Sequence, residues 1–509
     1  MNLIFKKLAD VIKKTTVLDF AKILVGLGIL LRSIQFFINQ GLREDEGHLA
    51  INLVNTGVLD ILKPFENGQV APPLFLLIEK INLLAFGQNE FAIRYFAFAS
   101  SCISLILLYY FLKSHTNSYI TLMGVGLMAM NRHLIFYAVA VKQYSSDLLV
   151  HLVLIFIFFC DKGFSKQNKF FLLGAIGMIS LWLSHTSSFI LFSISAYWLF
   201  TLKNMPHSEK IKIIVIWIGW SLSFILLYFS TIAGNPNQRL MTTYWGEHFM
   251  PLLPHHLEQF AWFSHHFRDM ISFSLGFSNK HAVLWLPFGI SFLIGIFYSI
   301  KRKEYQFLLL LAPMVVHLVV SGFSKYPFYH RLILYQTFPL FFFISTGFFF
   351  IVSFGANLIN SKIVLPASLA FVLLTQLMIT LTNFPYPTED LKKDLTVLKA
   401  NFKNGDKVYV YYPVDGVFDF YKKNYIPEGT PVYYGTESRK KFSNYEKQIV
   451  PLSGRVWFLF SHLYTNHAGI AEDDYIIQCA QKRGKVLLSG SSYSASVYLM
   501  ELDKVENAN

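Results

Sequence analysis

Long apolar runs joined by short, basic connections are the feature that most constrains this sequence. Of its 509 residues, 54% are hydrophobic and only 15% are charged, whereas soluble domains average about 25% charged residues. A helix needs roughly 20 apolar residues to cross a bilayer, where its backbone must satisfy its own hydrogen bonds. The pattern predicts a polytopic α-helical membrane protein with about eleven spanning helices. They are expected near residues 18–39, 91–112, 119–136, 146–160, 169–184, 187–202, 211–232, 282–300, 306–322, 332–353 and 362–382.

The distribution of positive charge predicts the orientation of these helices. The formal net charge is +13, but Lys and Arg gather in one set of short connections, and patches interleaved with aromatic residues, as in nucleic-acid-binding proteins, do not occur. Such basic connections stay on the cytoplasmic side. They are Lys113; Lys162, Lys166 and Lys169; Lys203, Lys210 and Lys212; Lys301, Arg302 and Lys303; Lys362; and the N-terminal Lys6, Lys7, Lys13 and Lys14. The N-terminus is therefore expected in the cytoplasm, with its first apolar run retained as a helix rather than cleaved.

Two segments depart from the spanning pattern. Residues 44–86 are amphipathic and interrupted by prolines, which predicts surface helices in the first external loop. After residue 382 charges of both signs mix, and short apolar runs alternate with helix-like stretches, which predicts a small α/β domain. The expected organisation is thus a membrane-embedded domain, 1–382, and an external soluble domain, 383–509. The three cysteines, Cys102, Cys160 and Cys479, have no paired spacing, so a disulfide framework is not expected.

The charged cluster Arg43-Glu44-Asp45-Glu46-Gly47-His48 directly follows the first apolar run. Carboxylates at the mouth of a membrane helix are costly unless water, a metal, a partner charge or a substrate uses them. Acidic residues also contribute little to membrane topology. Asp45 and Glu46 are therefore the first candidates for catalysis. Arg32, inside the first span, should face protein or a water-filled cavity rather than lipid.

Other polar residues fall in connections predicted to share the outer face. They are Gln69 to Pro73, the 132–147 segment with Lys142, Tyr144 and Asp147, the Ser184-His185-Thr186 turn, and Lys325 to Arg331. Taken singly, Lys142 and Arg331 could each be an interfacial anchor, and His185 could be a polar residue at a helix end. Tyr137, Tyr144, Tyr244, Trp245, Trp262, Tyr326 and Tyr329 could stack on sugar, although Trp and Tyr are enriched at every membrane interface.

The order of several motifs is recognisable. The matching residues are Asp45-Glu46, Ala71-Pro72-Pro73-Leu74, Gly87-Gln88-Asn89-Glu90 with Arg94, Tyr137 through Asp147, and Tyr326-Pro327 with His330-Arg331. This set resembles the GT-C glycosyltransferases, in the branch of the protein O-mannosyltransferases and the lipid A aminoarabinose transferase (glycosyltransferase family 39-like). The resemblance covers most of residues 18–350.

The resemblance implies a sugar donor linked to polyprenyl phosphate and transfer on the outer face, with the first-loop Asp45 as catalytic base. The candidate substrate-binding residues are Arg32, Arg43, Arg94, Lys142, Tyr144, Asp147, Tyr326, His330 and Arg331. Lipid A enzymes carry a Lys before the Pro-Pro pair, and this chain has Val70-Ala71 there. Other cations, among them Lys142, Arg94, Arg331 or Arg32, would have to bind the phosphate instead.

The chemistry fits this function independently. A departing polyprenyl phosphate needs cations rather than a proton donor, because the second pKa of a phosphate monoester is about 6. One base is then enough to take the acceptor proton, and a single displacement inverts the anomeric centre. No cofactor is certain. Glu46 and His48 could hold a divalent metal ion, since carboxylate oxygens suit hard cations, and the sequence leaves this open.

The expected function is therefore an inverting glycosyltransferase of the bacterial inner membrane, acting in the cell envelope on a glycan, lipid or protein acceptor, with protein glycosylation as one outcome. The expected partners are the lipid bilayer, the lipid-linked donor and that acceptor, and no nucleic acid. The alternative is a polytopic transporter or a flippase for lipid-linked sugars. A third possibility is a membrane scaffold without enzymatic activity, which leaves the clustered carboxylates unexplained.

Overall fold

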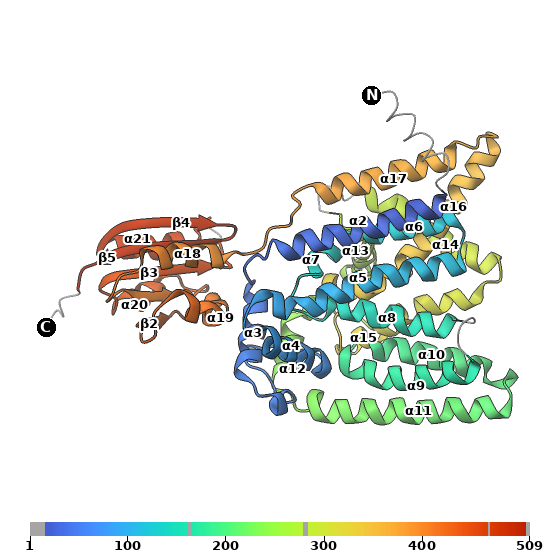
Figure 1. The fold of residues 1–509 in the computed structure, drawn as a ribbon, viewed down its shortest axis with the longest axis horizontal. Helices are drawn as coiled ribbons and strands as arrows, with labels where there is room; N and C mark the ends of the chain where they lie inside the picture. Colours follow the sequence, from blue (N-terminus) through green and yellow to red (C-terminus); the bar gives the residue numbers. More distant parts are fainter. Residues whose placement is uncertain (1–15, 161–164, 278–282, 467–468, 505–509) are drawn as a thin grey trace.

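The computed structural model describes residues 16–160, 165–277, 283–466 and 469–504. A bundle of long helices occupies one end of the molecule and a small mixed sheet occupies the other (Figure 1). The basic N-terminal residues Lys6, Lys7, Lys13 and Lys14, the loop residue Lys162 and the first residue of the expected 282–300 span lie outside the described residues.

The helical part runs from α2 to α17. Its elements are α2 (Val17–Phe37), α3 (Glu44–Asn55), η1 (Val58–Asp60), α4 (Pro73–Phe86), α5 (Glu90–His115), α6 (Ser118–Ala129), α7 (Arg132–Tyr137), α8 (Tyr144–Phe159), α9 (Lys166–Leu183), α10 (Ser187–Thr201), η2 (Leu202–Asn204), α11 (His207–Leu227), η3 (Tyr228–Ile232), α12 (Asn237–Tyr244), η4 (Gly246–His248), α13 (Leu257–Ser274), α14 (Trp285–Lys301), η6 (Tyr305–Leu311), α15 (Ala312–Gly322), η7 (His330–Gln336), α16 (Thr337–Leu358) and α17 (Val364–Leu381).

Every apolar run that was predicted to span the membrane is largely helical. Among the described residues, five helical segments are long and apolar enough to cross a membrane, judged by length and composition: Glu90–His115, His207–Ile232, Tyr305–Gly322, His330–Leu358 and Val364–Leu381. The α11 helix leaves many apolar side chains exposed, such as Ile218, Leu222 and Leu226, as a helix facing lipid would. The total of eleven spans stays a prediction.

The run predicted at 119–136 is broken rather than continuous. The α6 helix ends at Ala129, and the side chain of Asn131 caps α7 by accepting a hydrogen bond from the Leu134 N–H. Asparagine is one of the strongest N-cap residues, because its side-chain oxygen satisfies a free backbone donor of the first turn. After the break, α7 leads into the connection that carries Lys142 and ends where α8 begins at Tyr144.

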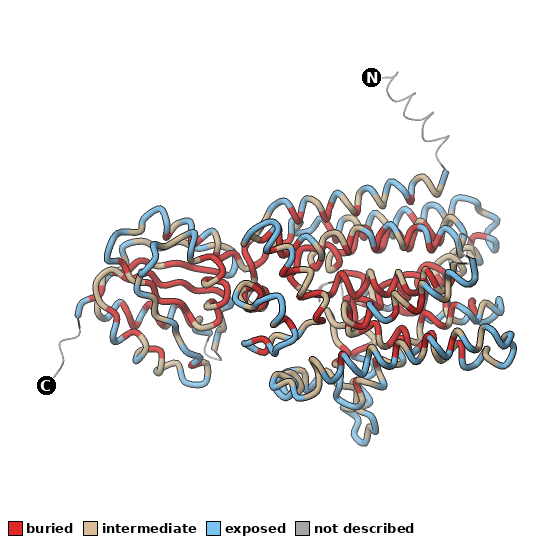
Figure 2. The backbone as a smooth tube through the Cα atoms, turned by 60° about the horizontal axis from the view of Figure 1, so that its bottom comes forward, coloured by how far each residue is buried: buried red, intermediate tan, exposed pale blue. Residues whose placement is uncertain are grey.

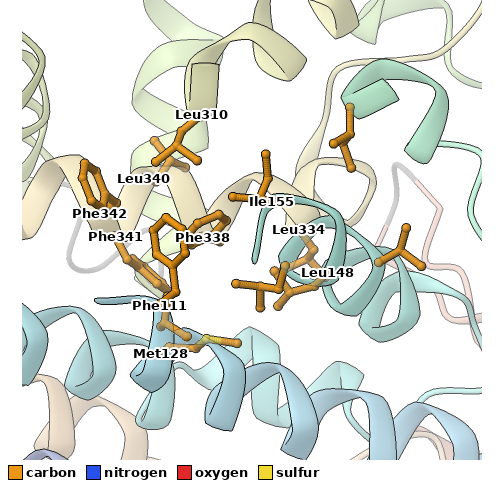
Figure 3. Packing of buried hydrophobic residues seen from close by; sticks show 14 of the residues in the cluster. Phe111, Met128, Leu148, Ile155, Leu310, Leu334, Phe338, Leu340, Phe341 and Phe342 are labelled. Atoms are coloured by element: carbon orange, nitrogen blue, oxygen red, sulfur yellow. The ribbon is translucent and has the colours of Figure 1, made fainter. Parts of the chain in front are cut away.

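Aromatic side chains fill the interior of the bundle. Phe111 of α5 meets Phe338 of α16 edge to face at a centroid distance of 5.0 Å, and Phe342 and Leu310 pack beside them (Figure 3). Edge-to-face contacts add about 0.5–1.5 kcal/mol beyond area burial. Figure 2 shows the buried residues concentrated inside the bundle and inside the sheet.

Two glycines allow α14 and α16 to lie backbone to backbone. A Cβ at Gly347 would lie 1.8 Å from the carbonyl oxygen of Ser291, and a Cβ at Gly295 would lie 2.0 Å from that of Phe343. Small residues at such crossings are typical of membrane helices, which depend on close packing because lipid offers no hydrophobic gain.

The first connection of the bundle contains the predicted helices. The α3 helix starts within the charged cluster, η1 follows, and α4 starts at Pro73, where proline's missing N–H costs nothing. In Figure 1 these helices lie at the end of the bundle that faces the sheet.

The C-terminal segment forms a five-stranded sheet with the order β2-β1-β3-β5-β4. The β1–β2 and β1–β3 pairs are parallel, and the β3–β5 and β4–β5 pairs are antiparallel. The elements are α18 (Leu391–Asn401), β1 (Lys407–Val410), η8 (Tyr412–Val414), α19 (Asp415–Tyr425), β2 (Val432–Tyr434), α20 (Ser443–Ile449), β3 (Gly454–Ser461), α21 (Glu472–Gln481), β4 (Gly484–Ser492) and β5 (Ala495–Leu502). The predicted α/β alternation is confirmed. The short apolar runs 407–412, 455–461 and 485–489 contain β1, nearly all of β3 and part of β4, and the helix-like stretches 415–424 and 471–482 form α19 and α21, whereas β2, β5, α18 and α20 were not predicted.

The sheet part packs directly on the first connection. A Cβ at Gly47 of α3 would lie 2.4 Å from a side-chain atom of Val417, and one at Gly416 would lie 2.9 Å from the backbone nitrogen of His48. One buried apolar cluster contains Leu49 and Phe75 of this connection together with Trp457 of the sheet. The sheet therefore supports α3, which carries the charged cluster.

We expect Gly347→Ala to lower the free energy of unfolding by about 1–3 kcal/mol, because the added methyl group must push α14 and α16 apart. Chemical denaturation in detergent micelles measures this. Gly355→Ala is the matched control on the same helix, since a Cβ there would meet nothing within 4 Å, and it should be neutral or slightly stabilising. Equal unfolding free energies for the two variants would contradict the close packing.

Candidate functional site

Asp45 lies in the first turn of α3, where the helix dipole favours negative charge. Its Oδ2 accepts a hydrogen bond from Nη1 of Arg331 at 3.0 Å, and its Oδ1 lies 3.7 Å from Nη2 of Arg43. Arg331 comes from η7, more than 280 residues later in the chain. The fold thus joins the first-loop carboxylate to the late Tyr-Pro…His-Arg motif.

The electrostatics of the site keep Asp45 ionised. Burial alone would raise the pKa of Asp45, but the positive charges of Arg43, Lys142 and Arg331 outweigh it and hold that pKa well below its usual range. The same carboxylates act on Arg43: burial opposes its charge, yet Asp45 and Glu46 raise the pKa of Arg43 above its ordinary value. The pKa shifts of Asp45 and Arg43 therefore both favour the charged forms.

Glu46 is buried, and both of its oxygens are used by the protein. Oε1 accepts from the Val141 N–H at 2.9 Å. Oε2 accepts from the Arg43 N–H at 3.0 Å and from Nη2 of Arg94 at 3.4 Å. Arg94 also donates to the carbonyls of Gln40 and Gly41. Glu46 thereby ties the start of α3 to α5 and to the connection before α8.

Lys142 reaches the same site from that connection. Its Nζ donates a hydrogen bond to Oε1 of Gln69 at 2.7 Å. The segment before the Pro-Pro pair therefore binds the Lys142 ammonium through a side-chain amide oxygen. Burial lowers the pKa of Lys142, although the charge of Asp45 opposes this shift. The chain thus places Lys142 near Asp45, although it lacks a Lys next to Pro72 and Pro73.

A cavity of about 410 Å³ opens beside Arg331, and we call it the aromatic cavity. The guanidinium of Arg331 lies over the rings of Tyr144 and Trp245, at 5.9 and 5.6 Å from their centroids. Small-molecule sites have volumes of about 300–1,000 Å³ and mostly apolar, aromatic linings. The lining residues are Tyr137, Tyr244, Trp245, His248, Phe273, Tyr329, His330 and Arg331.

Four of these lining residues belong to the aromatic set that the sequence places around the external loops. The sequence pointed to Tyr137, Tyr244, Trp245 and Tyr329 without distinguishing them from interfacial anchors. His248 belongs to the His-rich external loop 233–281, which could close over the donor or bind a metal but whose His spacing matches no zinc pattern. Phe273 carried no specific signal. His330, a predicted binding residue, lies between Phe273 and Tyr329, stacked at 4.7 and 3.6 Å.

Of the nine predicted binding residues, His330 and Arg331 line this cavity, and seven do not: Arg32, Arg43, Arg94, Lys142, Tyr144, Asp147 and Tyr326. Arg32 is fully buried and donates to Ser101 and to the carbonyls of Gly28, Met128 and Ala129. The Tyr326 ring packs against Phe189 and His317. Asp147 is buried on α8.

His48 connects α3 to the sheet part. Its Nε2 lies 3.3 Å from Oε1 of Glu44 and 3.6 Å from Oδ1 of Asp415, and its Nδ1 is 2.9 Å from Nδ2 of Asn67. Burial disfavours the imidazolium, but the hydrogen bond with Glu44 and the charge of Asp415 raise the pKa of His48 above its ordinary value. The pKa of Asp415 is itself raised by burial, against the opposing charge of His48.

No three His, Cys, Asp or Glu side chains come together as a metal site within the part of the chain that the structure describes. The two residues considered for a metal, Glu46 and His48, are turned toward N–H donors and toward Glu44 and Asp415 respectively.

We expect Glu46→Ala to lower the free energy of unfolding by about 3–5 kcal/mol, because it leaves the buried Arg94 guanidinium without its carboxylate. Denaturant titration of the purified protein measures the change. Glu66→Ala, an exposed position in the same connection, should stay within about 0.5 kcal/mol of the parent protein. A small effect of Glu46→Ala would show that its three contacts contribute little.

His48 should give the stability a pH dependence of known sign. Because its folded pKa is raised above the unfolded value of about 6.5, its contribution is complete below that value and is lost as pH rises through the folded pKa. The difference in unfolding free energy between the parent protein and His48→Asn should therefore shrink from about pH 6 to about pH 8. Denaturation at several pH values tests this, and a difference that grows with pH would refute it.

Comparisons with known proteins establish the fold. No family model matches this sequence, and no curated protein matches it. The structure is similar to the crystal structure of ArnT from Cupriavidus metallidurans bound to undecaprenyl phosphate, with a TM-score of 0.53 and 11% identity over 93% of this chain and 97% of that one. The apo structure of the same protein gives a TM-score of 0.49 and 10% identity, with the same coverage. This chain therefore has the fold of ArnT, the GT-C fold that the order of its motifs predicted.

Proposed function

We propose that this protein is a membrane glycosyltransferase that moves a sugar from a polyprenyl-phosphate donor to an acceptor hydroxyl, with inversion, and that Asp45 is its general base. The observation that carries the proposal is the position of the Asp45 carboxylate between Arg43 and Arg331, with Arg331 lining the aromatic cavity. A carboxylate at the mouth of a membrane helix is energetically costly unless charged partners or a substrate use it, and this one is kept beside two arginines. That arrangement supports a functional role for Asp45.

Asp45 would act on the acceptor. One of its oxygens takes the proton of the acceptor hydroxyl while the hydroxyl oxygen attacks the anomeric carbon of the donor sugar. The bond between that carbon and the phosphate oxygen breaks, and its electron pair stays on the phosphate. Because the attack and the departure occur in one displacement, the anomeric configuration inverts.

Cations would stabilise the leaving phosphate. Arg331 donates one N–H to Asp45, and a guanidinium has five N–H donors in all. The remaining donors and the ammonium of Lys142 are available to the phosphate, where preorganised charge lowers the barrier as negative charge develops. The sugar would occupy the aromatic cavity, whose rings present flat apolar faces.

The donor and its location follow from the membrane character of the chain. The five helical segments that are long and apolar enough to cross a membrane suit a donor that is itself carried in the bilayer, and the ArnT structure with the same fold is bound to undecaprenyl phosphate. We place the protein in a bacterial inner membrane. The basic connections predict that the first loop and residues 383–509 lie on the outer face.

The remaining candidates take supporting roles in this proposal. The contacts of Glu46, Arg94 and Arg32 suit residues that hold the framework around Asp45 rather than residues that touch substrate. His330 and Tyr144 remain on the substrate side, because His330 lines the aromatic cavity and Tyr144 lies under Arg331.

We expect Asp45→Asn to reduce transfer by about 10²–10⁴-fold, the usual contribution of a general base, because an amide cannot take the acceptor proton. The measurement is the turnover number with a purified polyprenyl-phosphate sugar and an extracted envelope acceptor fraction. Since cations hold the pKa of Asp45 low, activity should not fall in the range where ordinary aspartates become protonated.

Asp60→Asn is the control, since Asp60 lies on η1 of the same connection and forms an exposed ion pair with Lys63. It should leave the turnover number unchanged. If Asp45→Asn transfers sugar as fast as the parent protein, Asp45 is not the base. If the parent protein moves lipid-linked sugar across vesicles without forming product, the transporter or flippase alternative is favoured.

A further inference from the structure

A second cavity, of about 470 Å³, lies where the bundle meets the sheet part, and we call it the junction cavity. It is formed by α7, by the linker after α17, and by the turn between β4 and β5. Its lining residues are Arg132, Phe136, Asn383, Phe384, Pro385, Tyr386, Pro387 and Tyr493. None of them lines the aromatic cavity.

The lining combines flat apolar surfaces with one cation. The rings of Phe136, Phe384, Tyr386 and Tyr493 and two prolines supply the surfaces. Arg132 supplies the charge, and its guanidinium lies 5.2 Å from the centroid of the Tyr386 ring. Rings with one well-placed charged group are typical of sites for small polar ligands.

Arg132 has no anionic partner within the described parts of the chain, where neither an ion pair nor a side-chain hydrogen bond involves it. The other arginines around Asp45 differ. Arg331 and Arg43 lie beside Asp45, and Arg94 lies beside Glu46. A guanidinium held against a ring keeps its N–H donors free for a carboxylate or a phosphate, which it can bind with two parallel hydrogen bonds.

The junction cavity also lies close to the reacting carboxylate. The guanidinium of Arg43 is 5.0 Å from the ring of Phe136, a wall of this cavity, and 3.7 Å from Oδ1 of Asp45. Its Nη2 is buried and has no hydrogen-bond partner among the described residues. Asp45 thus lies between the two cavities. Its Oδ2 contacts Arg331, which lines the aromatic cavity, and its Oδ1 lies near Arg43, which packs on Phe136 of the junction cavity.

We propose that the junction cavity binds the acceptor, and that the acceptor is a saccharide bearing a phosphate or a carboxylate. The anion binds Arg132, and the sugar lies against the aromatic rings. The role of this saccharide as the acceptor rests on the proposed function. The binding of an anionic saccharide in the junction cavity does not depend on that function.

Binding is tested first, with the full-length protein in detergent micelles and glucose 1-phosphate as the probe, by titration calorimetry. All titrations use an Arg331→Gln background, so that the aromatic cavity does not contribute its own cation. Glucose and inorganic phosphate are titrated separately. We expect glucose 1-phosphate to bind more tightly than either, and Arg132→Gln to weaken its binding at least tenfold.

Two further variants make the result specific. Tyr493→Ala removes an exposed ring from the wall of the cavity, so it should weaken glucose 1-phosphate binding without affecting folding. Arg302→Gln is the matched control, because Arg302 also lies over a tyrosine ring, that of Tyr298 at 5.5 Å, but outside both cavities. It should leave binding unchanged.

The proposal is overturned if Arg132→Gln binds glucose 1-phosphate as well as its parent, or if inorganic phosphate binds as tightly as glucose 1-phosphate. In transfer assays on the unaltered background, Arg132→Gln should raise the KM for the acceptor fraction and leave kcat nearly unchanged. If Asp45→Asn transfers normally while the binding results hold, the proposed catalytic role fails and the anion site stands.

Discussion

The buried carboxylate of Glu46 is the interaction on which the arrangement of the site depends. It satisfies backbone donors from two segments and the guanidinium of Arg94, and it fixes the first turn of α3 against α5 and the connection before α8. A buried charge is tolerated only when its hydrogen bonds are complete. Because Glu46 is held this way, its neighbour Asp45 projects toward Arg331 in a defined direction.

The two adjacent acids, Asp45 and Glu46, have different partners and different exposure. Glu46 is enclosed and shares its charge with groups that belong to the framework. Asp45 is about one-fifth exposed, and its partner Arg331 is one-quarter exposed at the wall of a cavity. An exposed pair can exchange one of its contacts for a substrate, whereas a fully enclosed one cannot do so without a large desolvation cost. This difference in exposure supports the proposal that Asp45, and not Glu46, is the reacting group.

The sheet part, at the far end of the linker after α17 in Figure 1, packs on α3 through α19 and so supports the first connection. Gly47 and Gly416 let α3 and α19 lie in contact. His48 lies between two carboxylates, that of Glu44 on α3 and that of Asp415 on α19. The linker after α17 also forms much of the junction cavity. Residues that look like a boundary in the sequence, Pro385 and Pro387, are thus part of a cavity wall.

The sequence by itself determined the helices and the α/β character of the C-terminal segment, and it singled out Asp45 and Glu46 as candidates, because hydrophobic periodicity and the cost of charge near lipid are local properties. Arg331 and Lys142 were also predictable as members of a motif set. Only the tertiary structure decided which partner each arginine meets. Arg32 donates to backbone carbonyls and Arg94 donates to Glu46, whereas Arg132 contacts no carboxylate among the described residues. These differences arise from contacts between residues tens to hundreds of positions apart, which no local pattern encodes.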